Sequence, residues 1–219
     1  KGIYNAAVHQ TANAIAKRAF IQHLDEVVSK LPDEQKWVLV TAGGCGAGKG
    51  YSLKNVPETS DLLSKAGAVW DAAGEQNSTE NPWILEECRK RGLQARFVFV
   101  HADTKTTWDN PEGGVVERAG EVGRMVDAKL YADSYALGSK NFHSFMEKHK
   151  GDKDCGFNVL KNTRGQKPTR EEFVPEDALG LDSDDIYAHA AKVLKERASK
   201  LSEGVVRGGT IGERVWGRP

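Results

Sequence analysis

Four glycines within six residues follow directly on an apolar segment, and this junction restricts the possible folds more than any other part of the sequence. The apolar segment Trp37–Ala42 favours a buried strand, and the cluster Gly43–Lys49 after it fits the spacing G-x-x-x-x-G-K. Glycines let successive backbone N–H groups point into one concavity, a following helix adds its positive end, and Lys49 adds a charge. The junction therefore predicts a loop that binds the phosphates of a nucleoside triphosphate.

The residues directly after the lysine depart from the usual form of this loop. Gly50 stands where a Ser or Thr normally binds Mg²⁺, and Tyr51 and Ser52 follow. Loops of the adenylate kinase type also have this glycine, but a hydroxyl residue comes next. We take Ser52 as the candidate metal ligand; the alternative for the whole cluster is a glycine-rich turn that binds nothing. The predicted nucleotide-binding residues are Gly43, Gly44, Cys45, Gly46, Ala47, Gly48, Lys49, Gly50 and Tyr51.

Apolar strands alternate with helical patterns along the rest of the chain. Strands are expected at Trp37–Ala42, Ala68–Trp70, Ala95–Val100 and Phe157–Leu160, and helices at Tyr4–Leu31, Ser60–Lys65, Pro82–Arg91, Val115–Lys129, Asp133–His149 and Ser183–Leu201 with Ser183 as N-cap. This alternation predicts an α/β, P-loop NTPase-type three-layer fold, with a mainly parallel central sheet and helices on both faces. We expect one domain over residues 1–203 with a lid around 104–130, and a loosely held tail at 204–219.

Composition bears on partners and compartment. Lys+Arg and Asp+Glu both number 31, so the net charge is zero, which argues against a protein whose main task is to bind nucleic acid. No segment approaches the roughly 20 apolar residues of a membrane helix, so no membrane association is expected. Cys45, Cys88 and Cys155 have no metal-binding spacing and are interpreted as reduced thiols. A cytoplasmic location is expected, in a bacterium or after delivery into a host cell.

Two acidic residues follow predicted strands and are candidates for chemistry. Because ligands bind at the carboxyl edge of such sheets, Asp71 is placed to accept a proton from a substrate hydroxyl during phosphoryl transfer; the alternative is a cap of the next turn. Asp103 follows the third strand and is a candidate to hold Mg²⁺ through water, the alternative being a turn residue before Thr104. His101 lies near the same edge, where a core or turn role competes with ligand contact.

Arginines supply the positive charge that a transferring phosphoryl group needs. Arg118 and Arg124 lie six positions apart with two glycines between them, which suggests a mobile lid that closes over the phosphates. The alternative is a pair of solvated helix arginines. Arg164 and Arg170 are the next candidates.

Together these segments resemble the zeta-toxin-like P-loop kinases over roughly Val8 to Arg164. The segments that carry the resemblance are the first helix, Gly43–Lys49, Val69–Asp71, Arg118–Arg124, Ala132–Tyr135, Phe157–Leu160 and Lys161–Thr163. In that family a lysine and a hydroxyl residue of the loop bind phosphates and metal, an aspartate activates the acceptor hydroxyl, and arginines neutralise the transferred group. The resemblance assigns these roles to Lys49, Asp71, Arg118 and Arg124, but the hydroxyl does not carry over because of Gly50.

The resemblance also implies ATP and Mg²⁺ as cofactors. Family members phosphorylate UDP-N-acetylglucosamine, related effector kinases of plant-pathogenic bacteria phosphorylate NAD on its adenosine ribose, and many are toxins restrained by a small protein antitoxin. We therefore expect an ATP-dependent phosphotransferase acting on a hydroxyl of a nucleotide-linked small molecule, a toxin or effector with a small antitoxin or chaperone as partner.

Two other functions compete with the kinase. A nucleotide-dependent switch is disfavoured because Lys161–Arg164 does not fit the base-reading N-K-x-D motif of GTPases. A degenerate P-loop domain that acts by binding a protein partner is supported by Gly50 and Tyr51.

Overall fold

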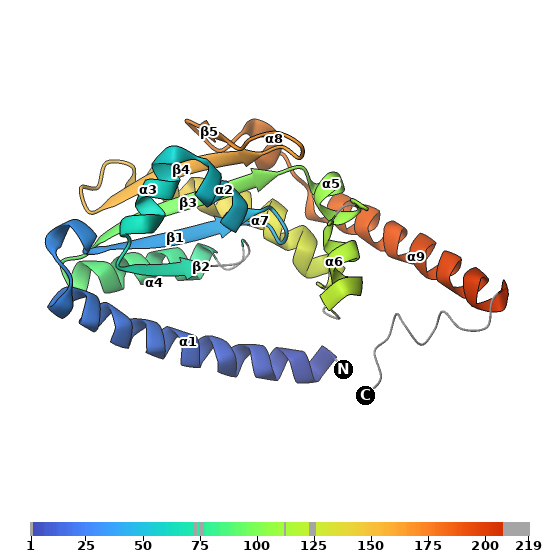
Figure 1. The fold of residues 1–219 in the computed structure, drawn as a ribbon, viewed down its shortest axis with the longest axis horizontal. Coiled ribbons are helices and arrows are strands. Elements are labelled where there is room, and N and C mark those ends of the chain that lie inside the picture. The colour runs from blue at the N-terminus through green and yellow to red at the C-terminus, as the bar shows by residue number, and fades with distance from the viewer. Residues whose placement is uncertain (1, 72–73, 75–76, 112, 123–125, 208–219) are drawn as a thin grey trace.

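The computed structural model describes residues 2–71, 74, 77–111, 113–122 and 126–207. Its five strands form one sheet in the order β2-β1-β3-β4-β5 (Figure 1). The strands are β1 (Trp37–Gly43), β2 (Ala68–Asp71), β3 (Gln94–Ala102), β4 (Cys155–Asn162) and β5 (Thr169–Glu171). The helices are α1 (Gly2–Lys30), α2 (Lys49–Asn55), α3 (Pro57–Lys65), α4 (Asn77–Lys90), α5 (Thr104–Trp108), α6 (Val115–Val122), α7 (Ala128–His149), α8 (Glu176–Leu179) and α9 (Ser183–Arg207), with a 3₁₀ turn at Asp33–Gln35.

The sheet is parallel except at one edge. β1 pairs in parallel with β2 on one side and with β3 on the other, β3 pairs in parallel with β4, and β5 is antiparallel to β4. From β1 the chain passes first to the edge strand β2 and then across to β3. The carboxyl end of β1 is therefore a switch point of the topology, where open α/β sheets bind ligands.

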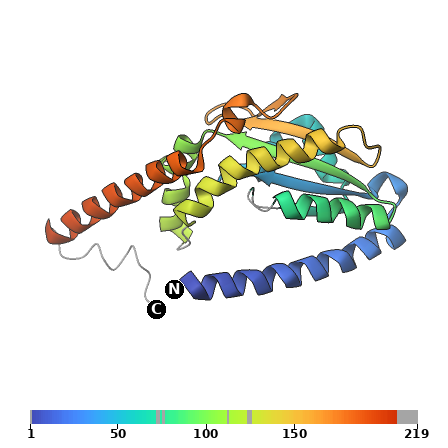
Figure 2. The ribbon, with the colours of Figure 1, turned by 180° about the vertical axis from the view of Figure 1, so that it is seen from behind.

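Helices cover both faces of this sheet, which confirms the predicted three-layer α/β fold (Figures 1 and 2). Alternate residues of β1 belong to different cores because successive side chains point to opposite faces. Val38 and Val40 pack in the core that includes residues of α1, α4 and the carboxyl half of α7. Leu39 packs in the other core, with residues of α2, α5 and α9. None of the described helices combines the length and the apolar character that crossing a membrane requires.

Helix boundaries differ from the expectation around α6 and α7. One helix was expected over Val115–Lys129, but α6 ends at Val122 and α7 already begins at Ala128. The reason is an N-cap, because the Asp127 carboxylate accepts hydrogen bonds from the backbone N–H groups of Lys129 and Leu130 at 2.9 and 3.1 Å. α7 is therefore longer than predicted.

The C-terminal helix also differs from the prediction. Asp182, rather than Ser183, caps α9, since its carboxylate accepts from the N–H groups of Asp184 and Asp185 at 2.8 and 3.1 Å. The Ser183 hydroxyl instead donates to Asp133 Oδ1 at 2.5 Å. Residues 204–207, expected in the tail, continue α9, and 208–219 lie outside the described residues. The short elements α5, α8 and β5 had not been predicted.

Candidate nucleotide site

The glycine cluster forms a turn between β1 and α2. Gly46 and Gly48 have φ values of 80° and 78°, in the left-handed region that side-chain-bearing residues rarely adopt. α2 begins at Lys49, and the Ser52 N–H bonds to the Gly48 carbonyl at 2.8 Å. The amides of Lys49, Gly50 and Tyr51 therefore belong to the first turn, where helix N–H groups have no intrahelical acceptor and favour anions.

Two distant elements hold the loop in place. The Cys45 N–H donates to Ser134 Oγ at 3.0 Å, and the Tyr135 hydroxyl donates to the Cys45 carbonyl at 3.3 Å, both from α7. A Cβ on Gly44 would lie 2.3 Å from the Tyr135 ring, so glycine permits this close packing. Burial raises the pKa of Tyr135, which keeps its hydroxyl protonated as a donor.

Asn162, at the carboxyl end of β4, fixes the other side of the loop. Its Nδ2 donates to the Ala47 carbonyl at 2.8 Å, and a Cβ on Gly48 would lie 2.3 Å from that nitrogen. Sequence reasoning assigned no role to Asn162. The signal was its position, as a polar residue that ends a buried parallel strand. The loop backbone is thus preorganised by hydrogen bonds to both α7 and β4.

Lys49 and Asp71, which sequence reasoning selected separately, lie together. Lys49 Nζ is 3.7 Å from Asp71 Oδ1 and donates to the Gly43 carbonyl at 3.4 Å. The parallel register places Thr41 beside Asp71, and the buried Thr41 hydroxyl donates to Asp71 Oδ1. The Asp71 side chain remains 67% exposed. A carboxylate oriented by Thr41 and open to solvent therefore stands beside the loop lysine.

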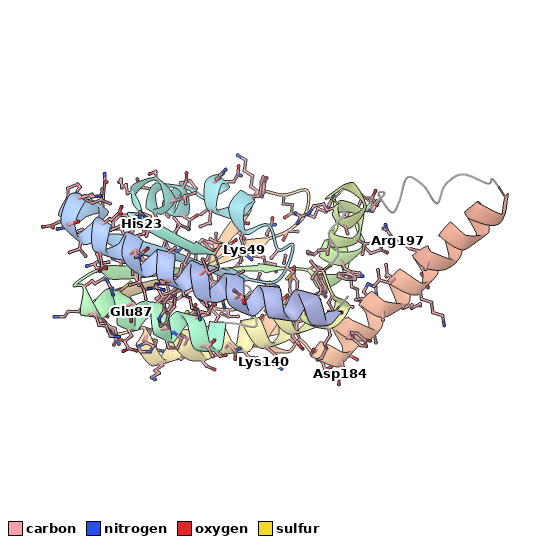
Figure 3. All side chains as sticks on the ribbon, turned by 90° about the horizontal axis from the view of Figure 1, so that it is seen from below. His23, Lys49, Glu87, Lys140, Asp184 and Arg197 are labelled. Atoms are coloured by element: carbon pink, nitrogen blue, oxygen red, sulfur yellow. The ribbon has the colours of Figure 1, made fainter. Side chains whose placement is uncertain are left out.

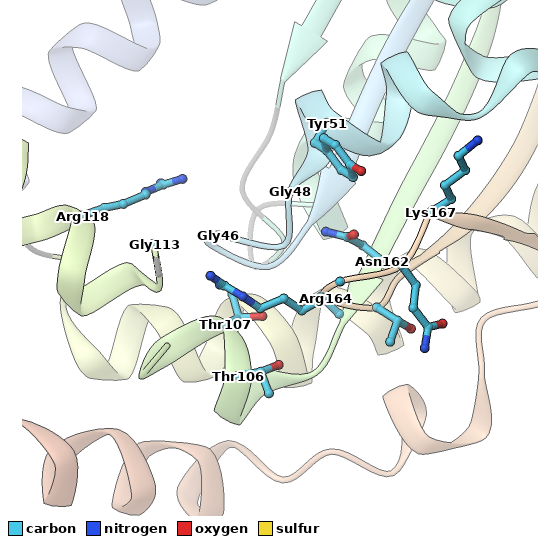
Figure 4. A pocket seen from close by; sticks show the side chains of 14 residues that line it. Gly46, Gly48, Tyr51, Thr106, Thr107, Gly113, Arg118, Asn162, Arg164 and Lys167 are labelled. Carbon is cyan, nitrogen blue, oxygen red and sulfur yellow. The ribbon is translucent and has the colours of Figure 1, made fainter. Parts of the chain in front are cut away.

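A pocket of about 750 Å³ lies over the loop (Figure 4). Arg118 lines it from α6, and Arg164 and Lys167 line it from the connection between β4 and β5. Figure 4 shows Arg118 on one side of the loop and Lys167 on the other, with Arg164 between them. Arg118 thus lines the pocket over the loop and its role in a lid stays a prediction, while Arg124 lies outside the described residues. Arg170 is on β5, and it is not among the residues that line this pocket.

The helix that carries Arg118, α6, is held in place by α9. Arg197 of α9, labelled in Figure 3, donates to Asp109 Oδ1 at 2.6 Å and to Glu117 Oε2 at 3.1 Å. Asp109 follows α5, and Glu117 precedes Arg118 on α6. α9 therefore joins α5 and α6 at the carboxyl end of the sheet.

The two predicted metal ligands are placed differently from Asp71. Ser52 is fully buried and its Oγ has no hydrogen-bond partner among the described residues, so it does not suit the metal role predicted for it. Asp103 caps α5, accepting from the Thr106 N–H and from its hydroxyl, both at 2.8 Å. This is the turn role weighed as its alternative. Mg²⁺ is often bound by one carboxylate together with substrate phosphates and water, and the exposed Asp71 carboxylate fits that chemistry.

His101 lines a second cavity of about 470 Å³ beside the first. It is 6% exposed, and its Nε2 lies 3.7 Å from Asp177 Oδ1. Burial lowers the pKa of His101, and the nearby Asp177 opposes this only in part. His101 does not line the pocket over the loop.

The strand, glycine loop and helix at the switch point of a mainly parallel sheet define this chain as an α/β protein of the P-loop NTPase type. No protein-family model and no curated protein sequence matches it. Among solved structures it is similar to the crystal structure of AvrRxo1-ORF1:-ORF2 with ATP. The two are 10% identical with a TM-score of 0.46, over 84% of this chain and 71% of the other. At this sequence identity and TM-score, the ATP and the protein partner of that complex are not assigned to this chain.

Proposed function

We propose that this protein is a kinase that transfers the γ-phosphoryl group of ATP to a hydroxyl of a small molecule. The observation that carries the proposal is the pairing of Lys49 Nζ with Asp71 Oδ1 at 3.7 Å beside a preorganised glycine loop. A cation for the phosphates and an exposed carboxylate for the acceptor hydroxyl are the two groups this transfer needs in one place.

Each described group has a distinct task in this reaction. The first-turn amides of α2 and Lys49 bind the β- and γ-phosphates, and Arg118 neutralises the charge on the transferred group. Asp71 accepts the proton of the acceptor hydroxyl, and Thr41 orients its carboxylate. A bound Mg²⁺ would be held mainly by phosphate oxygens and water near Asp71, and it would offset phosphate charge. Arg124 is a second candidate for the role of Arg118.

The acceptor class is proposed from the sequence resemblance. A nucleotide-linked small molecule of the UDP-N-acetylglucosamine or NAD class fits it, as do a toxin or effector role and a small protein antitoxin or chaperone as partner. The cationic groups that line the pocket, Arg118, Arg164 and Lys167, suit a substrate that carries phosphates of its own.

A second candidate function is a degenerate P-loop domain that acts by binding a protein partner. Its support is the absence of a suitable loop hydroxyl, since Gly50 has no side chain and Ser52 is buried. Glycine directly after the lysine does not by itself remove the phosphate-binding amides, so we favour the kinase.

Transfer from γ-labelled ATP into a small-metabolite extract distinguishes these functions. Label recovered in a small molecule with the parent protein, but not with Lys49→Ala, supports the kinase. Release of inorganic phosphate alone would support a hydrolysing switch, and neither product would support the partner-binding domain. UDP-N-acetylglucosamine and NAD are then tested singly as acceptors.

A further inference from the structure

Tyr51 is a large aromatic residue left exposed at the edge of the loop. It lies in the first turn of α2, is 53% exposed and lines the 750 Å³ pocket. Exposed single aromatics are common on protein surfaces, but this one borders a cavity together with Asn162 and Lys167 (Figure 4). Its position at the border of the pocket, rather than its exposed fraction, needs an explanation.

The two ends of the site differ in chemistry. Lys49, the first residue of α2, and Asp71, at the carboxyl end of β2, lie together at one end. The 750 Å³ pocket is lined by neither of them; it runs from Gly46 and Gly48 of the loop to the connection 163–168, where its lining includes Thr163, Gln166 and Lys167. If phosphoryl transfer takes place at Asp71, the γ-phosphate lies at that end. The nucleoside must then extend toward Tyr51 and the connection 163–168.

We propose that the Tyr51 ring stacks on the base of the bound nucleotide and holds it over the connection between β4 and β5. This inference rests on the proposed function, because the direction of the nucleotide follows from transfer at Asp71. A phenol ring carries no positive charge, so it adds little to phosphate binding, whereas any base offers a flat face to it. Among the described residues that line the pocket, Tyr51 supplies the aromatic surface and Gln166 and Thr163 supply hydrogen-bonding groups.

Calorimetric titration with two ligands tests this role. The ligands are ATP and inorganic tripolyphosphate, which has the phosphates but no base, and the proteins are the parent, Tyr51→Ala and Tyr51→Phe. Loss of a stacked base costs roughly 5- to 150-fold in affinity. We expect Tyr51→Ala to weaken ATP binding within that range and to leave tripolyphosphate binding unchanged. Tyr51→Phe keeps the ring and should bind both ligands as the parent does.

Three results would overturn the stacking role. The first is an unchanged ATP affinity in Tyr51→Ala. The second is an equal loss of affinity for ATP and tripolyphosphate in Tyr51→Ala, which would indicate a damaged loop. The third is a loss of ATP affinity in Tyr51→Phe as large as in Tyr51→Ala. Lys49→Ala provides the comparison, because it should lower the affinity for both ATP and tripolyphosphate. If the parent binds neither ligand, the proposed function itself fails, which is a different outcome from failure at Tyr51. Melting temperatures of all variants show whether the fold is intact.

Discussion

Replacing Lys49 by alanine should separate catalysis from folding. The Lys49 side chain is 18% exposed, and its partner Asp71 is 67% exposed, so their ion pair is largely screened by water. Such pairs contribute about 0–1 kcal/mol. We therefore expect the free energy of unfolding to change by less than about 1 kcal/mol, which limits the shift in Tm to about 2–4 °C at most for a chain of this size.

The effect on turnover should be much larger. A unit charge about 4 Å from a phosphate oxygen interacts with it by about 4 kcal/mol at an effective dielectric constant of 20. Because kcat/KM includes both phosphate binding and transition-state stabilisation, loss of that interaction corresponds to roughly a 10³-fold lower kcat/KM. Turnover by Lys49→Ala should thus be close to background while the protein remains folded.

The assay compares ATP turnover and thermal melting in the parent, Lys49→Ala and Lys54→Ala. Lys54 is an exposed lysine in the last turn of the same helix, so Lys54→Ala removes the same charge away from the loop. We expect parent-like turnover in this control. Turnover by Lys49→Ala within about tenfold of the control, with both proteins folded, would refute the phosphate-binding role of the loop.

Three further variants test the remaining groups. Asp71→Asn should retain ATP binding by calorimetry and lose about 10²- to 10⁴-fold in transfer rate; an unchanged rate would move the base to Asp103. Arg118→Ala should lower kcat much more than it raises the Kd for ATP, and a normal kcat would make Arg118 a surface residue and Arg164 the next candidate. Burial lowers the pKa of His101 in the folded protein, so below about pH 6.5 the unfolded chain binds a proton at this residue more readily than the folded chain does. The free energy of unfolding should therefore decrease as the pH falls. Urea unfolding between pH 7 and 5 should show a smaller decline in His101→Gln, and an equal decline would contradict this assignment.

Local pattern was sufficient to predict the fold class and to place Lys49 and Asp71 at the same edge of the sheet. Trp37–Ala42 followed by four glycines and Lys49 allows few structures, and parallel strands end at one edge, which is why Lys49 and Asp71 lie together. Boundaries governed by single side chains were harder to predict. Asp127 interrupts what reads as continuous helical periodicity, and only its capping hydrogen bonds show where α7 begins.

Contacts between distant segments could not be predicted from one sequence. Asn162 meets Ala47 across 115 positions, and Ser134 meets Cys45 across 89, so no local spacing signals either contact. The burial of Ser52, in contrast, has a local cause, which is its position on α2. Ser52 and Leu53 are the buried residues of α2, whereas Gly50 and Tyr51 face outward. A hydroxyl at position 52 therefore cannot replace one at position 50.

The packing of Gly44 against Tyr135 has an evolutionary consequence. Any side chain at position 44 would occupy the space of the Tyr135 ring, since even a Cβ would lie 2.3 Å from it. In diverged sequences of this fold, a larger residue at 44 should appear only where position 135 has become small. The two positions are 91 residues apart, so their joint substitution would mark lineages in which the loop and α7 have been remodelled together.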